Sequence, residues 1–556
     1  MTLAGLLNNA WMLACRREAM AFAAATRRVA ASQNEILGNV LRRNRDTHFG
    51  RTHSFASIRN PSEYQRRVPL MRYADYADAI QWISEGKQAV LTQDPVEVLE
   101  PTSGTTGSAS GRKLIPFTRS LRAQFQRAVA AWMFDLLRHR PAIRRGRAYW
   151  SISPALGGDR RTPGGVRIGF DADADYLGST GRWILRRLMA TPDAVSKLPD
   201  IEAFRYITLR FLLAADDLTL MSIWSPTFLP ALLGPLEPWA DRLCVDLRTG
   251  RLDPPTAIPA ELRRGLALLA RPRRADELRA IFRASAPLAD KLRQAWPRLS
   301  LISCWADAAA AHYLPPLRAL FPQVEWQPKG LLATEGCVSF PLLDRAGPVL
   351  AVRSHFFEFA EVASTEAAAP RLAHQLDAGG RYGVILTTAG GLYRYQLDDL
   401  VEVCGFENQC PLLRFLGKMD GVSDQVGEKL AEPFVRSVLS AVFDRHCLAP
   451  TFAMLVPVDS RPPRYRLYVQ APAPFDRRAI AAEVDAELRA NPHYDYAVRL
   501  GQLGAAEVVS LHPGGPSAWG VYERECVARG MRAGNVKPTM LDHRPDWSTI
   551  FDPLAL

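Results

Sequence analysis

The most informative segment of this 556-residue chain is residues 100–116, Glu-Pro-Thr-Ser-Gly-Thr-Thr-Gly-Ser-Ala-Ser-Gly-Arg-Lys-Leu-Ile-Pro. It follows a short alternating strand predicted at 96–100 and precedes a helix predicted at 119–138. Its glycines leave backbone N–H groups free to face an anion, its hydroxyls add side-chain donors, and Lys113 supplies a positive charge. Neither GxxxxGKS nor GxxxxGKT can be fitted to it, so it is not a Walker A loop. The pattern favours a phosphate-binding loop, and a plain Ser/Thr/Gly linker is the alternative.

Helical periodicity dominates the chain as far as residue 298. Helices are predicted at 1–60, 76–86, 119–138, 181–189, 228–247 and 263–298. The pattern changes at Leu299, where a strand at 299–304, a helix that ends at Phe321 and a strand at 324–327 follow one another. This alternation predicts a βαβ unit in a parallel sheet.

More strands follow, and the tail of the chain forms a separate module. Strands are predicted at 349–353, 356–362, 382–388, 393–396 and 401–404. In the tail, strands are predicted at 451–458, 464–471, 496–500 and 508–511, and helices at 477–491 and 516–530. We therefore expect an α/β fold with a small α+β module at its end. The boundary near 417–421 predicts two domains, a large one over 1–419 and a small, mobile one over 420–556.

The excess of positive charge says little about partners. The chain has 69 Lys and Arg against 57 Asp and Glu, a formal net charge of +12. The basic residues are spread along the chain, without the long basic blocks or the aromatic interleaving that single-strand binders use. We therefore expect no nucleic-acid partner. Lysines are rare among the basic residues, so their positions are informative: Lys87, Lys113, Lys197, Lys291, Lys329, Lys418, Lys429 and Lys537.

Composition also bears on the environment of the protein. No apolar stretch reaches the length of about 18 residues that a spanning helix needs, so no membrane span is expected. The eight cysteines are scattered without CxxC spacing, and the histidines form no ligand cluster around them. Reduced thiols in a cytoplasmic enzyme therefore fit better than a disulfide framework or a zinc site. We expect a monomer.

Three motifs downstream of the loop carry further chemistry. They are Leu331-Leu-Ala-Thr-Glu-Gly, Gly391-Leu-Tyr-Arg-Tyr-Gln-Leu-Asp-Asp-Leu and Phe415-Leu-Gly-Lys-Met-Asp-Gly-Val-Ser-Asp-Gln-Val-Gly-Glu-Lys-Leu. The first follows a strand and is expected to place Thr334 and Glu335 on a turn. The second puts a pair of carboxylates, Asp398 and Asp399, after a strand, and the third lies at the domain boundary. In this order and spacing, the set resembles the adenylate-forming superfamily of firefly luciferase and the acyl-CoA ligases.

Four segments narrow the resemblance. They are Lys113-Leu-Ile-Pro, Gly391-Leu-Tyr-Arg-Tyr, Asn491-Pro-His-Tyr-Asp-Tyr and Arg529-Gly-Met-Arg-Ala-Gly-Asn-Val-Lys-Pro. The set looks like the auxin-responsive Gretchen Hagen family of acyl-acid amido synthetases, and the likeness runs from about Val68 to Pro538. The resemblance implies a large N-terminal adenylate-forming domain with parallel and mixed sheets and a β-barrel-like part, followed by a small α+β C-terminal domain.

The resemblance also implies a two-step reaction that uses ATP and Mg²⁺. A carboxylic acid attacks the α-phosphorus of ATP and gives an acyl adenylate and pyrophosphate. An amine, usually that of an amino acid, then displaces AMP and forms an amide. This chemistry suits the motifs, because the moving phosphate charge must be neutralised by loop donors, lysine and a metal ion.

The resemblance assigns roles to residues of the large domain. The residues expected to contact the phosphates are Ser103, Gly104, Thr105, Thr106, Gly107 and Lys113. Thr334 belongs to the same nucleotide site, Glu335 would hold Mg²⁺, and Asp399 would accept hydrogen bonds from the ribose hydroxyls. Tyr393 and Arg394 are expected beside the adenine or the reacting carboxylate.

The resemblance assigns further roles around the small domain. Asp420 takes the position of the hinge about which this domain would rotate between the two half-reactions. Lys429 matches a family lysine near the α-phosphate, and Lys537 matches the lysine of the small domain's final loop. With Lys113, these are the expected catalytic lysines.

The sequence departs from the family pattern at two places, and it also suggests where the acyl pocket lies. The phosphate loop is two residues longer than the plant pattern, and Asp398 replaces the glycine that usually precedes the ribose aspartate. The acyl pocket is expected in the helical insert before Leu299. Its candidates are Phe211, Trp224 and Phe228, although such side chains more often belong to a core.

Two other functions stay open. An acyl-CoA ligase, or another acyl-adenylating enzyme with a thiol acceptor, shares the first half-reaction. A non-catalytic nucleotide-binding scaffold would share the fold alone. Neither the acid nor the amine is selected by the sequence.

Overall fold

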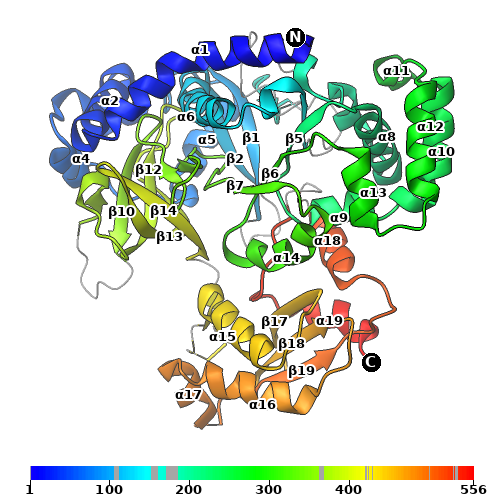
Figure 1. The fold of residues 1–556 in the computed structure, drawn as a ribbon. Helices are drawn as coiled ribbons and strands as arrows, with labels where there is room; N and C mark the ends of the chain where they lie inside the picture. Colours follow the sequence, from blue (N-terminus) through cyan, green and yellow to red (C-terminus); the bar gives the residue numbers. More distant parts are fainter. Residues whose placement is uncertain are drawn as a thin grey trace. The chain divides into compact units, whose positions relative to one another are not determined.

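The computed structural model describes residues 2–105, 112–151, 161–170, 186–361, 369–419, 422–423, 425–426, 428, 430–499, 501–529, 531 and 536–556 (Figure 1). Contacts between backbone atoms divide the chain into two units. Unit 1 comprises 1–307, 314–397 and 401–414, and unit 2 comprises 308–313, 398–400 and 415–556. Both units combine helices and sheets, so the expected α/β class is confirmed.

Unit 1 contains most of the helices. They include α1 (Leu3–Ala25), α2 (Val29–Asn44), α3 (His48–Thr52), α4 (Pro61–Arg67), α5 (Ala77–Ser84), α6 (Arg119–His139), α8 (Ile201–Ala214), α9 (Phe228–Leu233), α10 (Leu236–Thr249), α11 (Ala260–Arg263), α12 (Pro272–Arg283), α13 (Leu288–Ala295) and α14 (Leu314–Leu320). The long helix α6 begins at the predicted residue because the Thr118 hydroxyl accepts the Leu121 N–H at 3.2 Å. The single helix predicted over 228–247 is two helices, α9 and α10, separated at Gly234-Pro235, because proline has no backbone N–H to continue a helix.

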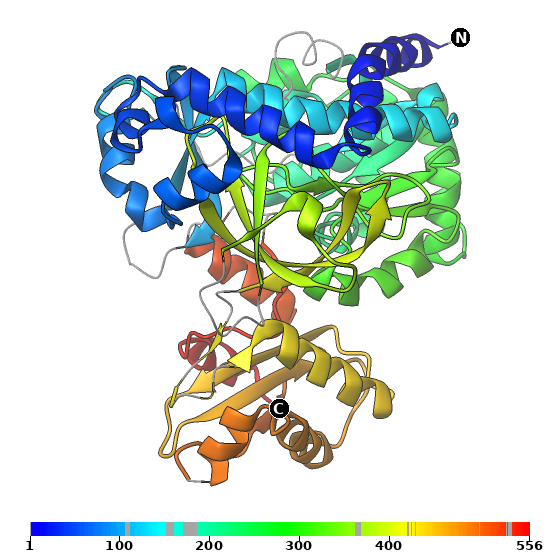
Figure 2. The ribbon, with the colours of Figure 1, turned by 90° about the vertical axis from the view of Figure 1, so that its left-hand side faces the viewer.

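The parallel sheet of unit 1 has the order β3-β5-β6-β7 and was expected in part from the βαβ pattern. Its strands are β3 (Arg147–Trp150), β5 (Leu218–Ser222), β6 (Leu301–Cys304) and β7 (Glu325–Pro328). Alternate side chains point to opposite faces. Met221 and Ile302 pack with α8, α10, α12 and α13, whereas Leu220 and Leu301 pack with α6 and α1. Helices α1 and α6 lie side by side over this second face (Figures 1 and 2).

Two more sheets lie in unit 1. A seven-stranded sheet has the order β11-β10-β12-β13-β14-β9-β8, and a three-stranded sheet has the order β2-β1-β4. Their strands are β1 (Val96–Thr105), β2 (Arg112–Thr118), β4 (Arg167–Ile168), β8 (Ser339–Phe340), β9 (Val349–Leu350), β10 (Phe356–Glu361), β11 (Arg371–Leu372), β12 (Arg381–Thr387), β13 (Tyr395–Glu407) and β14 (Cys410–Lys418).

These sheets correct two sequence predictions. The segment that contains the expected phosphate loop joins the antiparallel strands β1 and β2, so an unpredicted strand, β2, lies between it and the helix α6. The strands predicted at 393–396 and 401–404 are one strand, β13, and the Asp398-Asp399 pair lies inside it rather than after it. Asp398 has a φ of +59°, a left-handed conformation that interrupts the regular pleat without ending the strand.

Unit 2 is built around a three-stranded sheet with the order β17-β18-β19. Its elements are β15 (Val422–Ser423), β16 (Leu430–Ala431), α15 (Glu432–Arg445), β17 (Phe452–Val458), β18 (Arg464–Gln470), α16 (Arg477–Leu488), α17 (Pro492–Arg499), β19 (Glu507–Ser510), α18 (Ala518–Ala528) and α19 (Trp547–Phe551). Leu455 and Leu467 face α15 and α16, whereas Met454 and Tyr468 face α18 and α19. The sheet therefore has a helical layer on each face.

One tail prediction is wrong. Residues 496–499 of the segment predicted as a strand at 496–500 belong to the helix α17, and residue 500 lies outside the described residues. The reason is local, because the Asn491 side chain accepts the Tyr494 N–H at 3.3 Å and Pro492 occupies the first helical position. These start signals override the alternating pattern that favoured a strand.

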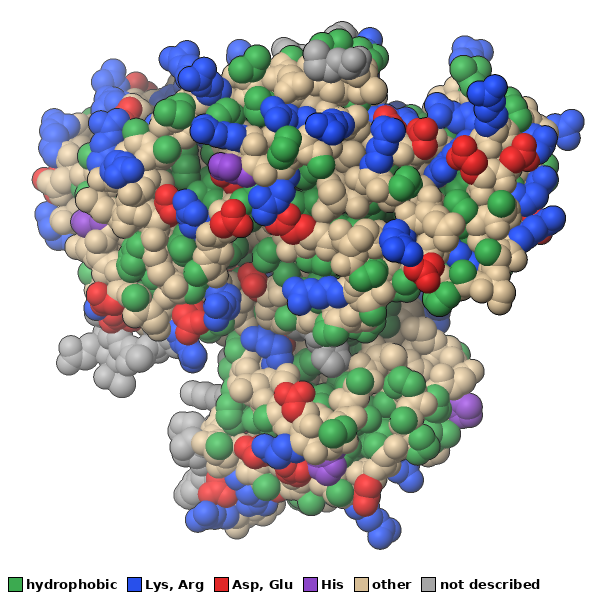
Figure 3. All heavy atoms as spheres, in the orientation of Figure 1, with side chains coloured by type: hydrophobic (Ala, Val, Ile, Leu, Met, Phe, Trp, Pro, Cys, Tyr) green, Lys and Arg blue, Asp and Glu red, His purple; other side chains and the backbone are tan. Residues whose placement is uncertain are grey.

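Two features of the structure relate to the expectations about a membrane span and a nucleic-acid partner. Among the helices that the structure describes, none has both the length and the apolar character needed to cross a membrane. On the face drawn in Figure 3, Lys and Arg side chains are interspersed with Asp and Glu rather than gathered into one basic patch.

Tyr393 and Arg394, expected beside the nucleotide, are core residues in the structure. Tyr393 is fully buried and donates its hydroxyl to the Leu91 carbonyl at 2.6 Å. Arg394 is 4% exposed and binds the 1%-exposed Glu358 carboxylate, with Nη2 to Oε1 at 2.9 Å and Nε to Oε2 at 3.0 Å. Its Nη1 donates to the Val68 carbonyl at 2.7 Å. Both side chains are engaged inside unit 1, so they position the neighbouring chain.

We predict that Arg394→Ala lowers the melting temperature by several degrees. It leaves the Glu358 carboxylate buried without its counter-ion, which costs about 3–5 kcal/mol in other proteins. Arg371→Ala is the matched control, because Arg371, on β11 of the same sheet, forms partly exposed ion pairs with Glu361 and Asp377. This substitution should lower the free energy of unfolding by about 1 kcal/mol or less. Thermal unfolding measures both. Equal melting temperatures for the two variants would contradict the core role of Arg394.

Candidate functional site

Glu335 lies on a tight turn between β7 and β8, as the sequence predicts. The Ala333 N–H donates to the Gly336 carbonyl at 3.0 Å, and the Gly336 N–H donates back to the Ala333 carbonyl at 3.2 Å. The Glu335 carboxylate is 7% exposed and accepts a hydrogen bond from the Tyr395 hydroxyl at 3.4 Å. Thr334, beside it on the turn, is half-buried. The turn thus holds a carboxylate and a hydroxyl in fixed positions.

A buried histidine supports this turn. The Cys337 N–H donates to His355 Nε2 at 3.0 Å, so Nε2 is an acceptor and Nδ1 carries the proton that is donated to Gln124 Oε1 at 3.0 Å. Burial, with a smaller contribution from Arg127, lowers the pKa of His355 to about 3. A Cβ on Gly336 would lie 2.9 Å from Nε2, so the turn needs glycine there. The imidazole is neutral and in close contact with the turn.

Tyr73 brings the loop lysine and the turn carboxylate into one neighbourhood. The Leu114 N–H on β2 donates to the Tyr73 hydroxyl at 2.7 Å. Lys113 Nζ lies 5.9 Å from the centroid of the Tyr73 ring. Burial raises the pKa of Tyr73, and the negative charge of Glu335 raises it further. Lys113 and Glu335, more than two hundred residues apart in the sequence, therefore share Tyr73 as a neighbour.

Residues 103–105 and 112–113, which flank the centre of the glycine-rich segment, belong to the paired strands β1 and β2. Ser103, Gly104 and Thr105 are the last residues of β1, and the structure describes their backbone but not their side chains. Thr106 and Gly107 lie outside the described residues. Lys113, half-buried on β2, is on the returning strand. Lys113 therefore lies on the strand that pairs with β1.

Asp399 is paired with one of the rare lysines. It is 1% exposed, and Lys418 Nζ lies 2.7 Å from its Oδ1. By this distance the two groups form an ion pair. The Lys418 side chain is 44% exposed. Asp398, in the left-handed conformation, accepts the Met419 N–H at its carbonyl oxygen at 2.7 Å.

The three candidates for the acyl pocket have different environments. Phe211 is 7% exposed and belongs to the core between the parallel sheet and α8, so the structure makes it a core residue. Phe228 is half-buried and packs against the same core. Trp224 is half-buried, and Lys329 Nζ lies 4.8 Å from the centroid of its ring. The Phe211 ring also lies 5.9 Å from Arg210 Cζ, but both of those residues are buried, whereas Trp224 combines a partly exposed aromatic surface with a nearby charge.

The predicted residues of the small domain are partly described. Lys537 is exposed in unit 2, and its Nζ lies 5.9 Å from the centroid of the Phe415 ring. Asp420 and Lys429 lie outside the described residues. Their predicted roles therefore rest on the sequence.

Sequence analysis missed Tyr73, Gln124, His355 and the surroundings of Lys329. Tyr73 and His355 lie outside the motifs, and their contacts with the Glu335 turn come from distant parts of the chain. The Lys329 signal was present, because a lysine six positions before Glu335 stands out in an arginine-rich chain.

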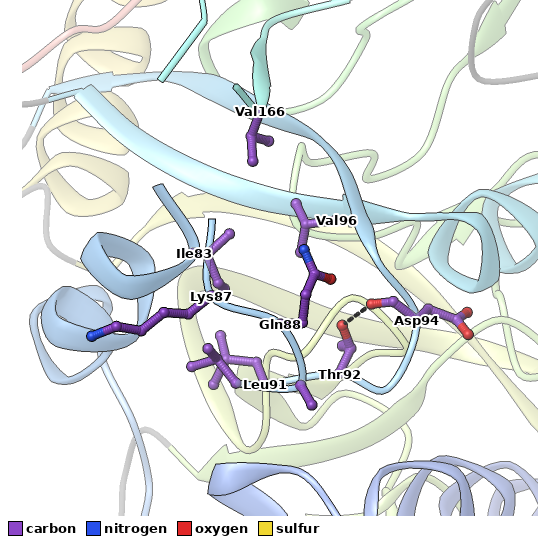
Figure 4. Close-up of a pocket in the computed structure, with 10 residues that line it drawn as sticks. Ile83, Lys87, Gln88, Leu91, Thr92, Asp94, Val96 and Val166 are labelled. Carbon is purple, nitrogen blue, oxygen red and sulfur yellow. Dashed lines mark hydrogen bonds between the residues drawn. The ribbon is translucent and has the colours of Figure 1, made fainter. Parts of the chain in front are cut away.

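A shallow pocket elsewhere in unit 1 holds none of these residues. It is lined by Ile83, Lys87, Gln88, Ala89, Val90, Leu91, Thr92, Asp94, Val96 and Val166 (Figure 4). Thr92 Oγ1 donates across it to the Asp94 carbonyl at 2.7 Å. Most of its lining comes from residues 87–94, which precede β1, and none of the lining residues belongs to the candidate site.

We predict that His355→Gln flattens the pH dependence of stability. The folded imidazole stays neutral down to a pH of about 3, whereas an unfolded histidine takes up a proton below about 6.5. The stabilisation is therefore fully present above pH 6.5 and is lost as the pH falls from 6.5 towards 3. Between pH 7.5 and 5.0 this amounts to about 2 kcal/mol. Urea denaturation of both proteins at the two pH values measures it, and an unchanged stability difference between them would contradict the neutral assignment.

Three family models match consecutive parts of the chain. They are the GH3 family N-terminal domain over residues 18–326, the GH3 family central domain over 348–418 and the GH3 family C-terminal domain over 435–545. The first alone covers more than half of the 556 residues.

Curated relatives agree with this match. The probable indole-3-acetic acid-amido synthetase GH3.12 of Oryza sativa subsp. japonica is 27% identical over 436 residues, which are 71% of this chain and 70% of the relative. The indole-3-acetic acid-amido synthetase GH3.10 of Arabidopsis thaliana is 25% identical over 513 residues, which are 83% of each chain.

A solved structure has the same fold. The AtGH3.15 acyl acid amido synthetase in complex with 2,4-DB superposes with a TM-score of 0.83 at 20% sequence identity, covering 98% of this chain and 96% of that chain. At this identity the likeness concerns the fold. The resemblance to the Gretchen Hagen family is confirmed by the three consecutive domain matches, and the chain belongs to the GH3 family.

Proposed function

We propose that this chain is an ATP-dependent acyl-acid amido synthetase, which activates a carboxylic acid as its adenylate and transfers the acyl group to an amine. The observation that carries the proposal is the neighbourhood of Lys113, Tyr73 and Glu335 in a chain of the GH3 family. A cation and a buried carboxylate beside a glycine-rich hairpin are the groups that a bound nucleoside triphosphate and its metal ion require.

The donor set fits ATP with Mg²⁺. Within the described ranges, no three His, Cys, Asp or Glu side chains come together as a self-sufficient metal site. Mg²⁺ is commonly held by one or two carboxylates together with substrate phosphates, so the single buried carboxylate of Glu335 is a suitable protein ligand. The metal ion would neutralise phosphate charge as the α-phosphorus is attacked. Tyr395 and the His355-supported turn would keep Glu335 oriented.

The remaining nucleotide contacts follow the family pattern. The proposed phosphate-binding residues are Ser103, Gly104, Thr105, Thr106, Gly107 and Lys113, with Thr334 beside Glu335. Asp399 would accept hydrogen bonds from the ribose hydroxyls. Its pairing with the half-exposed Lys418 supports this role, because a lysine side chain can move aside without leaving a cavity in the core.

The proposed reaction has two steps. An oxygen of the substrate carboxylate attacks the α-phosphorus, and the bond to the bridging oxygen breaks, which releases pyrophosphate. The amine nitrogen then attacks the acyl carbon, the bond to AMP breaks, and the nitrogen loses a proton. Lys113 and the hairpin N–H groups would stabilise charge that grows on the phosphate oxygens in the first step.

The small domain would contribute to the second step. We propose Asp420 as the hinge, Lys429 as the lysine near the α-phosphate and Lys537 as the lysine of the final loop, as the family motifs imply. The division of the chain into two units, with the long segment of unit 2 beginning at Phe415, supports a hinge at this place in the sequence. The corresponding domains are 1–419 and 420–556.

We propose a cytoplasmic location. All eight cysteines are within the described residues and are free thiols, seven of them wholly or largely shielded from solvent. This usage supports a reducing compartment. The proposed oligomeric state is a monomer.

We predict that Glu335→Gln lowers acid-dependent ATP–pyrophosphate exchange by about 100-fold or more, because it removes a charge that is aimed at the metal and phosphates. Glu261→Gln is the matched control, since Glu261 is an exposed residue of α11. The melting temperatures of both variants should match that of the parent protein. Exchange that survives Glu335→Gln would contradict the metal assignment.

The acceptor is tested separately. Incubation with a carboxylic acid, ATP and an amino acid should release AMP and form an amide. The same mixture with CoA in place of the amino acid should not release AMP above the acid-only rate. AMP release that requires CoA and ignores amino acids would favour the acyl-CoA ligase instead.

A further inference from the structure

Four neighbouring strands of the parallel sheet place one polar or amphipathic residue each in a single cross-strand row. Trp150 on β3 pairs with Ser222 on β5, Ser222 pairs with Ser303 on β6, and Ser303 pairs with Gln327 on β7. Directly paired residues of adjacent strands point to the same face. We call these four residues the polar row. It lies on the face of the sheet that α6 covers, because Trp150 and Trp132 of α6 pack into the same cluster.

The polar row has more donors than acceptors. Gln327 is 5% exposed, and its Oε1 accepts the Trp132 indole N–H at 3.0 Å. An indole N–H only donates, so this bond fixes the amide with Nε2 on the other side. In the part of the chain that the structure describes, Gln327 Nε2, Ser303 Oγ and Trp150 Nε1 are buried without a hydrogen-bond partner. A buried unpaired donor is costly, so three in one row indicate a ligand with acceptor atoms.

Lys329 extends the row. It comes two residues after Gln327, and its Nζ donates to Ser222 Oγ at 2.5 Å. The same Nζ lies 4.8 Å from the centroid of the Trp224 ring and 5.5 Å from that of Trp132. The side chain is half-buried, as is Trp224. An ammonium group between two indole rings is held in place, and the flat rings beside it offer a surface on which an aromatic ring can stack.

The location of the row is that of a ligand site. Trp150, Ser222, Gln327 and Lys329 all lie at or just beyond the carboxyl ends of their strands. In open α/β sheets, ligands bind outside the carboxyl ends of parallel strands. Lys329 and Glu335 lie six residues apart on the connection between β7 and β8, so the row and the proposed metal-binding carboxylate are carried by neighbouring parts of the chain.

We infer that the polar row and Lys329 form the subsite for the distal end of the acyl acid, and that the substrate is a flat, aromatic acid carrying a second carboxylate. The inference rests on the proposed function, because it assigns the acid that is adenylated. The second carboxylate supplies the acceptors that Gln327, Ser303 and Trp150 lack and places a negative charge against the Lys329 ammonium. Its ring stacks on Trp224. A neutral acceptor would meet the needs of the amide and hydroxyl but would not use the charge.

Four matched acids test the inference: benzoate, terephthalate, the monomethyl ester of terephthalate, and isophthalate as a second dicarboxylate. ATP–pyrophosphate exchange gives kcat/KM for each. We expect the parent protein to prefer a dicarboxylate over the uncharged ester of similar shape by about 10-fold or more. Lys329→Met keeps the length of the side chain without its charge, and it should lower the dicarboxylate-to-benzoate ratio by about 30-fold. The exposed Lys197→Met is the control and should leave the ratio unchanged.

A second variant guards against misfolding. Gln327→Glu replaces the unpaired donor with a negative charge of the same size, so it should also lower the dicarboxylate-to-benzoate ratio. A ratio that is unchanged in both variants, at melting temperatures equal to the parent's, overturns the inference. A preference of the parent protein for benzoate or for the ester over both dicarboxylates overturns it as well.

A binding measurement separates the subsite from the proposed function. Terephthalate and isophthalate are titrated without ATP, and quenching of tryptophan fluorescence reports binding near Trp132 and Trp224. Binding that Lys329→Met weakens, with no exchange for any acid, supports the subsite and contradicts the synthetase proposal. Exchange with benzoate but no Lys329-dependent binding of a dicarboxylate supports the synthetase proposal and overturns the subsite.

Discussion

The buried residue His355, with its neutral imidazole, links three parts of the large unit by hydrogen bonds. Its ring nitrogens join the Glu335 turn to α6, through the Cys337 N–H and Gln124 Oε1. Its own carbonyl accepts a hydrogen bond from Gln33 of α2 at 2.8 Å. The bond from the Cys337 N–H requires the uncharged ring, so burial that keeps the imidazole neutral is a condition for this contact with the turn. A protonated ring would lose its acceptor and leave the Cys337 N–H buried without a partner. The turn that carries the carboxylate of the candidate site thus depends on a fully buried side chain.

Local signals made much of the fold predictable. The boundaries of α6 follow from a capping threonine and helical periodicity, and the βαβ unit follows from alternating periods. The Glu335 turn was also predictable, because short motifs carry their own turn chemistry. What failed depends on distant partners. Arg394 stands in a motif expected beside the adenine or the reacting carboxylate, yet its guanidinium binds the buried Glu358 carboxylate in the core. No local pattern could have predicted that partner.

Arginine and lysine side chains lie in different surroundings in this protein. Many arginines form exposed pairs that stabilise little, and Arg394 is a structural exception with a buried carboxylate. The rare lysines are found in more specific surroundings. Lys113 lies beside Tyr73, Lys418 beside Asp399, and Lys329 between two tryptophans. A compact ammonium on a flexible stem suits contacts that must form and release during turnover, whereas a guanidinium suits fixed, two-pronged pairing.

The polar row also has a consequence for how such a protein diversifies. Each strand contributes one position to it, and the hydrogen-bonded ladder between the strands does not depend on those side chains. Single substitutions can therefore change the side chains of the row one at a time, while the backbone of the sheet stays the same. Serine at two positions and glutamine at a third are uncharged, so an apolar or a charged replacement at any of them changes what the row can bind. A lineage can in this way exchange one acid for another by drift and selection at four sites, and the activation chemistry encoded elsewhere in the chain is left untouched.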